Sequence, residues 1–220
     1  TASTTGGAAG GTTIGMSNAT LAPGGSCTVT TAVLVTGAAG TRTNAAFAVT
    51  FDNAPDPTAG SANLTVTALV EPTVTKTFVT NPILTGGTSV LRIVITNPNT
   101  TGAGNTITGI SFSDTYPAGL VNAATPNATI TGGSCSGGTL VAVPGGNSIS
   151  LSGAQITATA AADTCTIDVT VTAAAAGAYF NSTGSITTSN TPPQTAPATA
   201  TLNVLSPPTI TKSFVPSSIA

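Results

Sequence analysis

Hydrophobic and polar residues alternate in short runs along this chain, and Gly, Pro and Asn separate the runs. Leu91, Ile93 and Ile95 occupy every second position of one run, and residues 165–171 repeat the pattern. Alternate residues of a strand share a face, so these runs predict half-buried strands of an all-β sandwich. In the central region the expected strands span residues 73–79, 89–96, 106–114, 127–131, 139–143, 148–151, 164–172, 179–188 and 197–205.

One eight-residue stretch occurs twice. Pro72–Val79 returns as Pro208–Val215, with six of eight positions identical and a spacing of 208 − 72 = 136 residues. Self-similarity at a domain-sized spacing indicates tandem modules. In the first copy Lys76 alternates with apolar residues, so it is predicted to lie on an apolar strand face. The second copy repeats this alternation with Ile210, Lys212 and Phe214.

The region before the first copy aligns with the second half of the region between the copies. We therefore predict that residues 1–71 are the C-terminal half of a sandwich module and that residues 72–207 are a complete module. Residues 208–220 are then the first strand of the next module. The matched segments are Ile14–Ser17 with Ile149–Ser152, Cys27–Val33 with Cys165–Val171, Asn44 with Asn181, and Ala62–Val66 with Ala200–Val204.

Five motifs carry a resemblance to a known family: Pro72–Phe78 with its repeat, Thr96–Asn99, Phe112–Leu120, Cys165–Val169 and Gly177–Thr183. They are similar to motifs of bacterial surface repeats catalogued as domain of unknown function eleven and its relatives, which occur in tandem in very long secreted proteins. The resemblance covers essentially the whole chain. It implies tandem immunoglobulin-like β-sandwich modules in a stalk, adhesin or fibre, and it implies no enzymatic activity.

The composition narrows the possible settings. Charged residues make up 5% of the chain and the net charge is −2, so no basic surface indicates nucleic acid or anionic lipid. The 40% hydrophobic content argues against disorder, and no apolar run approaches the ~20 residues that span a membrane. A surface of Thr, Ser and Asn with almost no Lys suits an extracellular setting. No signal peptide is visible, so the sequence reads as an excerpt or a processed product.

Few residues could perform chemistry. The chain has no His, which removes the usual general base and the commonest metal ligand. Asp52 and Asp56 could hold a calcium ion together with backbone oxygens, but a capped polar turn is the favoured interpretation. We therefore predict no catalytic residues, no metal and no cofactor.

The three cysteines suggest one disulfide per module. Cys135 and Cys165 are the pair within residues 72–207, and a secreted composition favours a bond over two buried thiols. Cys27 is the repeat equivalent of Cys165, so its partner is expected outside this sequence. The closed loop of 165 − 135 = 30 residues would contribute up to about 3–4 kcal/mol in the chain-entropy model.

Lys76 requires a partner if it is buried, because an unpaired ammonium in a sandwich costs several kcal/mol. Alternation places Thr108, Ile110, Phe112 and Asp114 on one strand face, so Asp114 is the expected partner. One interpretation is a buried ion pair, or a lysine that reaches solvent at the sheet edge. The other is an isopeptide bond, known in similar surface-protein sandwiches, from Lys76 to Asn181 or Asn97 with Asp114 as the proton shuttle.

The leading functional hypothesis is a non-enzymatic structural repeat of a secreted bacterial surface protein. Its partners would be copies of itself in a head-to-tail filament or long tandem array. The strand over residues 209–215 would then add to the half-module of the next copy, unless the sequence is a window of one long chain. The alternatives are an adhesin module that binds a surface glycan or protein, and an accessory domain of a secreted enzyme.

Overall fold

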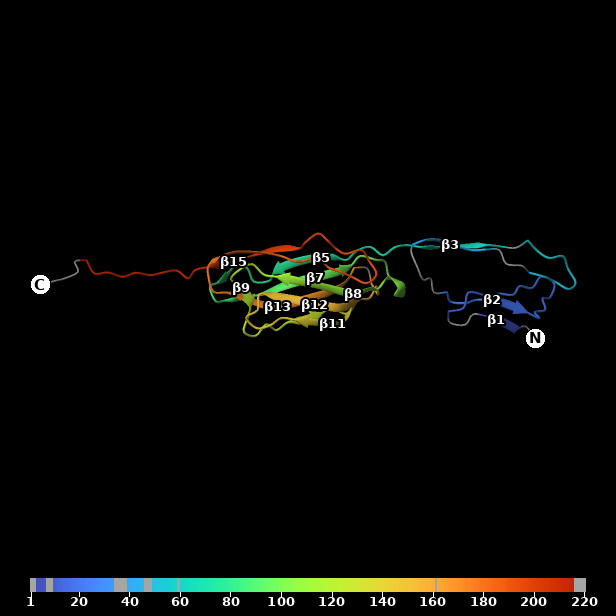
Figure 1. The fold of residues 1–220 in the computed structure, drawn as a ribbon, viewed down its shortest axis with the longest axis horizontal. Helices are drawn as coiled ribbons and strands as arrows, with labels where there is room; N and C mark the ends of the chain where they lie inside the picture. The colour runs from blue at the N-terminus through green and yellow to red at the C-terminus, as the bar shows by residue number, and fades with distance from the viewer. Residues whose placement is uncertain are drawn as a thin grey trace. The chain divides into compact units, whose positions relative to one another are not determined.

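The computed structural model describes residues 3–6, 10–33, 39–45, 49–58, 60–160 and 162–215. The chain divides into two compact units, residues 1–67 and residues 68–220 (Figure 1). The two units are described separately below, because each has its own sheets.

The unit of residues 68–220 is a two-layer β-sandwich, as Figure 1 shows, and the prediction of an all-β sandwich fold is confirmed. One layer is the sheet in the order β10-β13-β7-β5, with β9 also paired to β13. The other contains the sheets β11-β12-β8 and β14-β15-β6. Strand bounds are β5 Thr73–Phe78, β6 Ile83–Leu84, β7 Thr88–Asn97, β8 Ile107–Thr115, β9 Leu120–Asn122, β10 Thr129–Thr131, β11 Cys135–Val141, β12 Ser148–Ile156, β13 Asp163–Ala173, β14 Gly177–Ser182 and β15 Thr199–Leu205, with a short 3₁₀ turn at Ala103–Asn105.

The antiparallel pair β7–β13 is the centre of the first layer. Its register runs unbroken from Asp163 opposite Asn97 to Thr172 opposite Thr88. Every second residue of β13 is buried, and Leu91, Ile93 and Ile95 on β7 are at most 1% exposed, as the alternation predicted. Burial of each such side chain stabilises the fold by about 1.5–3 kcal/mol.

The face of β8 differs from the prediction at Thr108. Ile107 is fully buried and Thr108 is not, although simple alternation placed Thr108 with Ile110. The reason is a β-bulge: Ile156 on β12 pairs with Ile107 while Ala154 pairs with Ile110, so β8 contains one extra residue. Gly109 supplies the bend with φ = 66°, in the left-handed region that glycine tolerates best.

Several predicted strand bounds were also wrong. β6 and β9 were not predicted, and β12 continues to Ile156 rather than ending at residue 151. The strand expected over residues 179–188 ends at Ser182, after which the chain makes single bridges such as Thr187 to Ser111. The bridge from Thr187 to Ser111 places the segment after β14 beside β8, and so connects the two sheets of the second layer.

The unit of residues 1–67 contains two hairpins: β1 Ser3–Gly6 with β2 Ile14–Ser17, and β3 Gly40–Asn44 with β4 Ala62–Val66. Each repeats the register of a hairpin in the larger unit. Asn44 pairs with Ala62 as Asn181 pairs with Ala200, and Ser17 pairs with Ser3 as Ser152 pairs with Thr139. None of the residues in this unit whose burial is described is buried. Seven of its larger apolar side chains are 40–71% exposed: Ile14, Met16, Leu21, Val29, Val33, Phe51 and Leu64.

The strand predicted at residues 209–215 is not formed in this structure. Residues 206–214 have no strand assignment, and Ile210 and Phe214 are 94% and 78% exposed. The repeat equivalent of this segment, β5, owes its strand conformation to hydrogen bonding with β7. Within the described residues nothing pairs with residues 209–215 in that way.

The bulge at Gly109 gives a test of the fold. In Gly109→Ala the methyl group would lie 2.0 Å from Ser189 Oγ, and the left-handed backbone alone costs a non-glycine residue about 1–2 kcal/mol. We expect a fall of at least that size in the free energy of unfolding, measured by urea titration. Gly104→Ala is the matched control, because nothing lies within 4 Å of its added methyl group. Equal stability of the two variants would contradict the bulge.

Candidate functional site

Lys76 is the centre of a buried polar cluster that we call the Lys76 cluster: Lys76, Asp114 and Asn181. Its strand β5 alternates exposed and buried positions, and the lysine falls on the buried face, opposite Ile93 of β7. Its Nζ lies 2.6 Å from Asp114 Oδ2, and both side chains are fully buried. The structure therefore brings together, across the two layers, the two residues that the alternation along the sequence had predicted to be partners.

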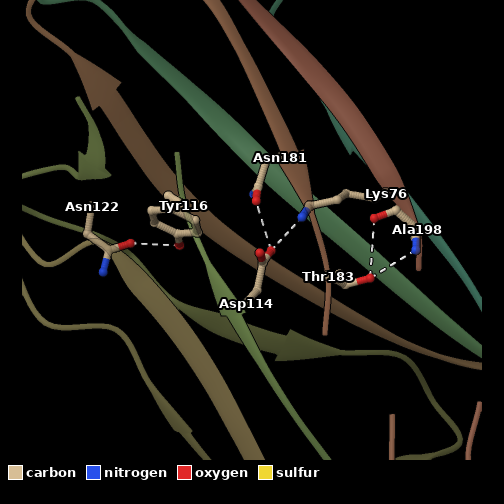
Figure 2. A network of polar contacts seen from close by, with 7 residues as sticks. All are labelled: Lys76, Asp114, Tyr116, Asn122, Asn181, Thr183 and Ala198. Carbon is tan, nitrogen blue, oxygen red and sulfur yellow. Dashed lines mark hydrogen bonds and ion pairs between the residues drawn. The ribbon is translucent and has the colours of Figure 1, made fainter. Parts of the chain in front are cut away.

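Asn181 completes the cluster from β14. Its Nδ2 donates a hydrogen bond of 3.3 Å to Asp114 Oδ2, the same oxygen that contacts Lys76, and the residue is 1% exposed. Figure 2 shows the Lys76 and Asn181 side chains both directed at the Asp114 carboxylate. Three strands distant in sequence, β5, β8 and β14, thus meet at one carboxylate oxygen.

Burial favours the neutral forms of the charged pair. It lowers the pKa of Lys76, and this effect outweighs the opposing attraction of Asp114. It raises the pKa of Asp114, and this effect outweighs the attraction of Lys76 and the hydrogen bond from Asn181. The two shifts have the same consequence, since each favours transfer of the shared proton from the amine to the carboxylate.

The Lys76 cluster is also poorly satisfied. Among the described residues, four buried side-chain nitrogen or oxygen atoms have no hydrogen-bond partner, and three belong to this cluster: Lys76 Nζ, Asp114 Oδ1 and Asn181 Oδ1. The ion pair of Lys76 is short but does not have hydrogen-bond alignment. Each buried group without a partner costs about 1–3 kcal/mol, so the arrangement is expensive as it stands.

Neighbouring polar contacts fix the strands that carry the cluster. Tyr116, two residues after Asp114, donates its hydroxyl proton to Asn122 Oδ1 at 2.9 Å (Figure 2), and burial raises the pKa of this phenol. Asn122 Nδ2 in turn donates to the carbonyl oxygens of Val143 and Ser148, both at 2.9 Å. Three hydrogen bonds join Thr183 and Ala198 just beyond β14.

Both tyrosines are buried, Tyr116 at 4% and Tyr179 at 9% exposure. The chain has two Tyr and no Trp, the two residue types whose rings carry a polar group that a glycan-binding platform could use. Their burial removes them from any surface of that kind.

Asn97 does not belong to the Lys76 cluster. Its Nδ2 donates to the carbonyl oxygens of Asn105 at 2.9 Å and Ile156 at 3.3 Å, and its Oδ1 accepts from the Asn99 backbone N–H. Asn99, the last residue of the motif Thr96–Asn99, for which no role was predicted, accepts from the Val70 N–H at 2.8 Å and donates to the Val70 carbonyl at 3.1 Å. This linker clamp, Asn97 with Asn99, fixes the chain just before β5.

The structure joins Cys135 on β11 to Cys165 on β13, with the sulfur atoms 1.93 Å apart. The bond therefore connects the two layers beside the core. Cys27 is a free, exposed thiol in the smaller unit.

Asp163, at the start of β13, closes the turn beside the disulfide. Its Oδ1 accepts from Ser134 Oγ at 2.6 Å, and its Oδ2 accepts from the Ala160 N–H at 2.9 Å and from the backbone and hydroxyl of Thr159. These bonds stabilise the charged form and lower the pKa of Asp163 to about 2.

In the part of the chain that the structure describes, no group of three or more His, Cys, Asp or Glu side chains could hold a metal ion. Asp56 Oδ1 accepts from the Phe51 N–H at 3.0 Å, a contact that closes the loop between the two residues. The described residues contain no helix with the length and apolar character needed to span a membrane.

A family model described as "Domain of unknown function (DUF7933)" matches residues 1–66 and 72–204. The narrower resemblance to domain of unknown function eleven is not confirmed by this match. No curated protein matches the chain.

Solved structures share low sequence identity with the chain. A cohesin module of a family 33 glycoside hydrolase from Clostridium perfringens covers 64% of this chain and all of its own, with 10% identity and a TM-score of 0.43. The match to the bacterial hydrophobin BslA covers 65% of this chain and 100% of the hydrophobin chain, with 16% identity and a TM-score of 0.42. The match to the collagen adhesin CNA from S. aureus covers 66% of this chain and 53% of the adhesin chain, with 12% identity and a TM-score of 0.39.

Removal of the disulfide should destabilise the larger unit. We expect the double variant Cys135→Ala/Cys165→Ala to lose up to about 3–4 kcal/mol of unfolding free energy, measured by denaturant titration. Thiol labelling of denatured, unreduced wild-type protein should find Cys27 alone, and reduction should reveal the other two of the three cysteines. Labelling of Cys135 and Cys165 before reduction would contradict the bond.

Asp163 should make stability depend on pH in the acid range. Because its folded pKa lies below the ordinary value of about 3.9, its contribution is complete above pH 4 and is lost as the pH falls through about 2. We expect Asp163→Asn to be less stable than wild type at pH 7. The difference in unfolding free energy should shrink between pH 4 and pH 2 in paired thermal melts, and a constant difference would reject this role.

Proposed function

The chain belongs to the DUF7933 family, and from this premise we propose that it is a non-enzymatic structural repeat of a secreted surface protein. In this proposal, sandwich modules of about the size of residues 72–207 follow one another and form an extracellular stalk or filament. The β-sandwich fold agrees with a binding or structural module, and the proposal names the structural one.

The observation that carries the proposal is the repeated hairpin register. Gly40 pairs with Val66 as Gly177 pairs with Val204, and Asn44 pairs with Ala62 as Asn181 pairs with Ala200. Two segments that are similar in sequence therefore also have the same strand pairing. This agreement supports the interpretation of residues 1–71 as the second half of a module, followed by a whole one.

The linker clamp supports a chain of modules with a defined junction. Asn99 holds both backbone groups of Val70, so the residues that lead into β5 are fixed to the module that follows them. By the internal repeat, the residues after β15 would meet the same clamp in the next module. The copies are then either parts of one long chain or separate subunits in head-to-tail contact.

An extracellular location is supported by the disulfide and by the surface composition. Disulfides persist in oxidising compartments, and the chain carries 5% charged residues. The adhesin and enzyme-accessory alternatives remain predictions of the sequence. Because Tyr116 and Tyr179 are buried, they add no support to the adhesin alternative.

Electron microscopy of the native protein tests the proposal. Protein released from the surface of the producing cells, and identified with an antibody to residues 72–207, should form linear strings of similar beads. The antibody should also label intact cells, with pre-immune serum as the control.

Two results would contradict the proposal: a single compact particle, or labelling only after the cells are permeabilised. A denaturing gel separates the two forms of assembly. One long tandem chain keeps its large mass, whereas head-to-tail subunits release discrete monomers.

A further inference from the structure

We propose that Lys76 and Asn181 form an intramolecular isopeptide bond, with Asp114 as the residue that transfers the proton. The inference goes beyond the proposed function and does not depend on a tandem array. It rests on the geometry of the Lys76 cluster within one module.

The cluster places a nucleophile, Lys76, and an electrophile, Asn181, on the same proton carrier, Asp114. Asp114 Oδ2 lies 2.6 Å from Lys76 Nζ and 3.3 Å from Asn181 Nδ2. One oxygen atom therefore touches both the amine that would attack and the amine that would leave. All three residues are at most 6% exposed, so bulk water does not compete with Nζ for the amide.

Among the buried asparagines that the structure describes, Asn181 is the one whose amide carbonyl has no hydrogen-bond partner. Asn97 and Asn122 use both ends of their amides in hydrogen bonds with other groups. Asn181 Oδ1 has no partner, and its Nδ2 contacts the Asp114 carboxylate. The carbonyl of Asn181 can therefore polarise towards a donor without the loss of an existing bond.

The environment also provides the reactive protonation states. Burial lowers the pKa of Lys76 and raises the pKa of Asp114, so the pair can exist as a neutral amine and a carboxylic acid. A neutral amine has the lone pair that attack requires, and a carboxylic acid can protonate a leaving group.

The step balances without an added reagent. Lys76 Nζ attacks Cγ of Asn181 and forms the new C–N bond, and the bond from Cγ to Nδ2 breaks. Asp114 delivers its proton to Nδ2 and takes one proton from Nζ, so the carboxyl group ends in the protonated state in which it began. The products are a secondary amide between the two side chains and one molecule of ammonia.

The bond would also resolve the unsatisfied groups of the Lys76 cluster. A buried amine and a primary amide become one secondary amide, whose N–H can donate to Asp114. The same two residue types recur in the partial repeats, where Lys212 aligns with Lys76 and Asn44 aligns with Asn181 at the same hairpin position.

Intact-mass spectrometry of the reduced, denatured wild-type protein tests the proposal. We expect a mass lower than that of the sequence by one ammonia. Trypsin can cleave only after Arg42, Lys76, Arg92 and Lys212, the four basic residues of the chain. A bonded Lys76 is not cleaved, so residues 43–92 should appear joined to residues 93–212.

The mass and the tryptic peptides of the wild-type protein show whether the Lys76–Asn181 bond forms, and no variant is needed for this. An unshifted mass would overturn the bond. So would a loss of ammonia with separate peptides 43–76, 77–92 and 93–212, because that pattern is cyclisation of an asparagine on its own backbone.

Variants then assign the roles. Lys76→Ala and Asn181→Ala should each restore the full mass, whereas Lys212→Ala and Asn44→Ala, at exposed repeat equivalents, should keep the ammonia loss. The isosteric Asp114→Asn should fold, as judged by its circular dichroism and intact disulfide, but should not lose ammonia. An Asp114→Asn protein that still forms the bond would remove Asp114 from the reaction.

Discussion

A lysine side chain that is fully buried in a β-sandwich needs an acidic partner, and this requirement constrains how β5, β8 and β14 meet in the larger unit. Desolvation of an unpaired ammonium costs several kcal/mol, more than one buried aliphatic side chain returns. Lys76 on β5 therefore depends on Asp114 on β8 across the two layers. Because Asn181 on β14 contacts the same carboxylate oxygen, this contact fixes the positions of three strands, β5, β8 and β14, relative to one another.

Alternation along the sequence was enough to predict the main strands and the buried ion pair. It works for β7 and β13 because each is long and half buried, so Leu91 to Ile95 and the facing residues of β13 repeat every second position. β6 and β9 have two and three residues, too few to show a period. They form because Ile83 meets Val204 and Leu120 meets Ala173, contacts that only the folded chain creates.

The strand face predicted for Thr108 was wrong, and Asn97, one of the two candidate acceptors, lies outside the Lys76 cluster; the two outcomes have separate physical causes. At Thr108 the period is interrupted by one extra residue, and a glycine alone does not reveal whether a strand bends there. At Asn97 the parity was right, since the residue is buried like Ile93 and Ile95. Parity gives the face of a strand but not the position along it. Asn97 lies four residues beyond Ile93, the partner of Lys76, or roughly 13 Å at ~3.3 Å per residue.

The position of the disulfide has a mechanical consequence for any chain pulled from both ends. Tension would enter the larger unit at Thr73 and leave at Leu205, the outer ends of β5 and β15. Hydrogen bonds in the antiparallel pair β5–β7 are perpendicular to the strands, so force along β5 shears all of them together. If the sheets then separate, the chain between Cys135 and Cys165 still cannot extend, because its ends are bonded. The disulfide thus prevents the extension of on the order of 100 Å of chain, because its cysteines are 30 residues apart and an extended residue spans ~3.3 Å.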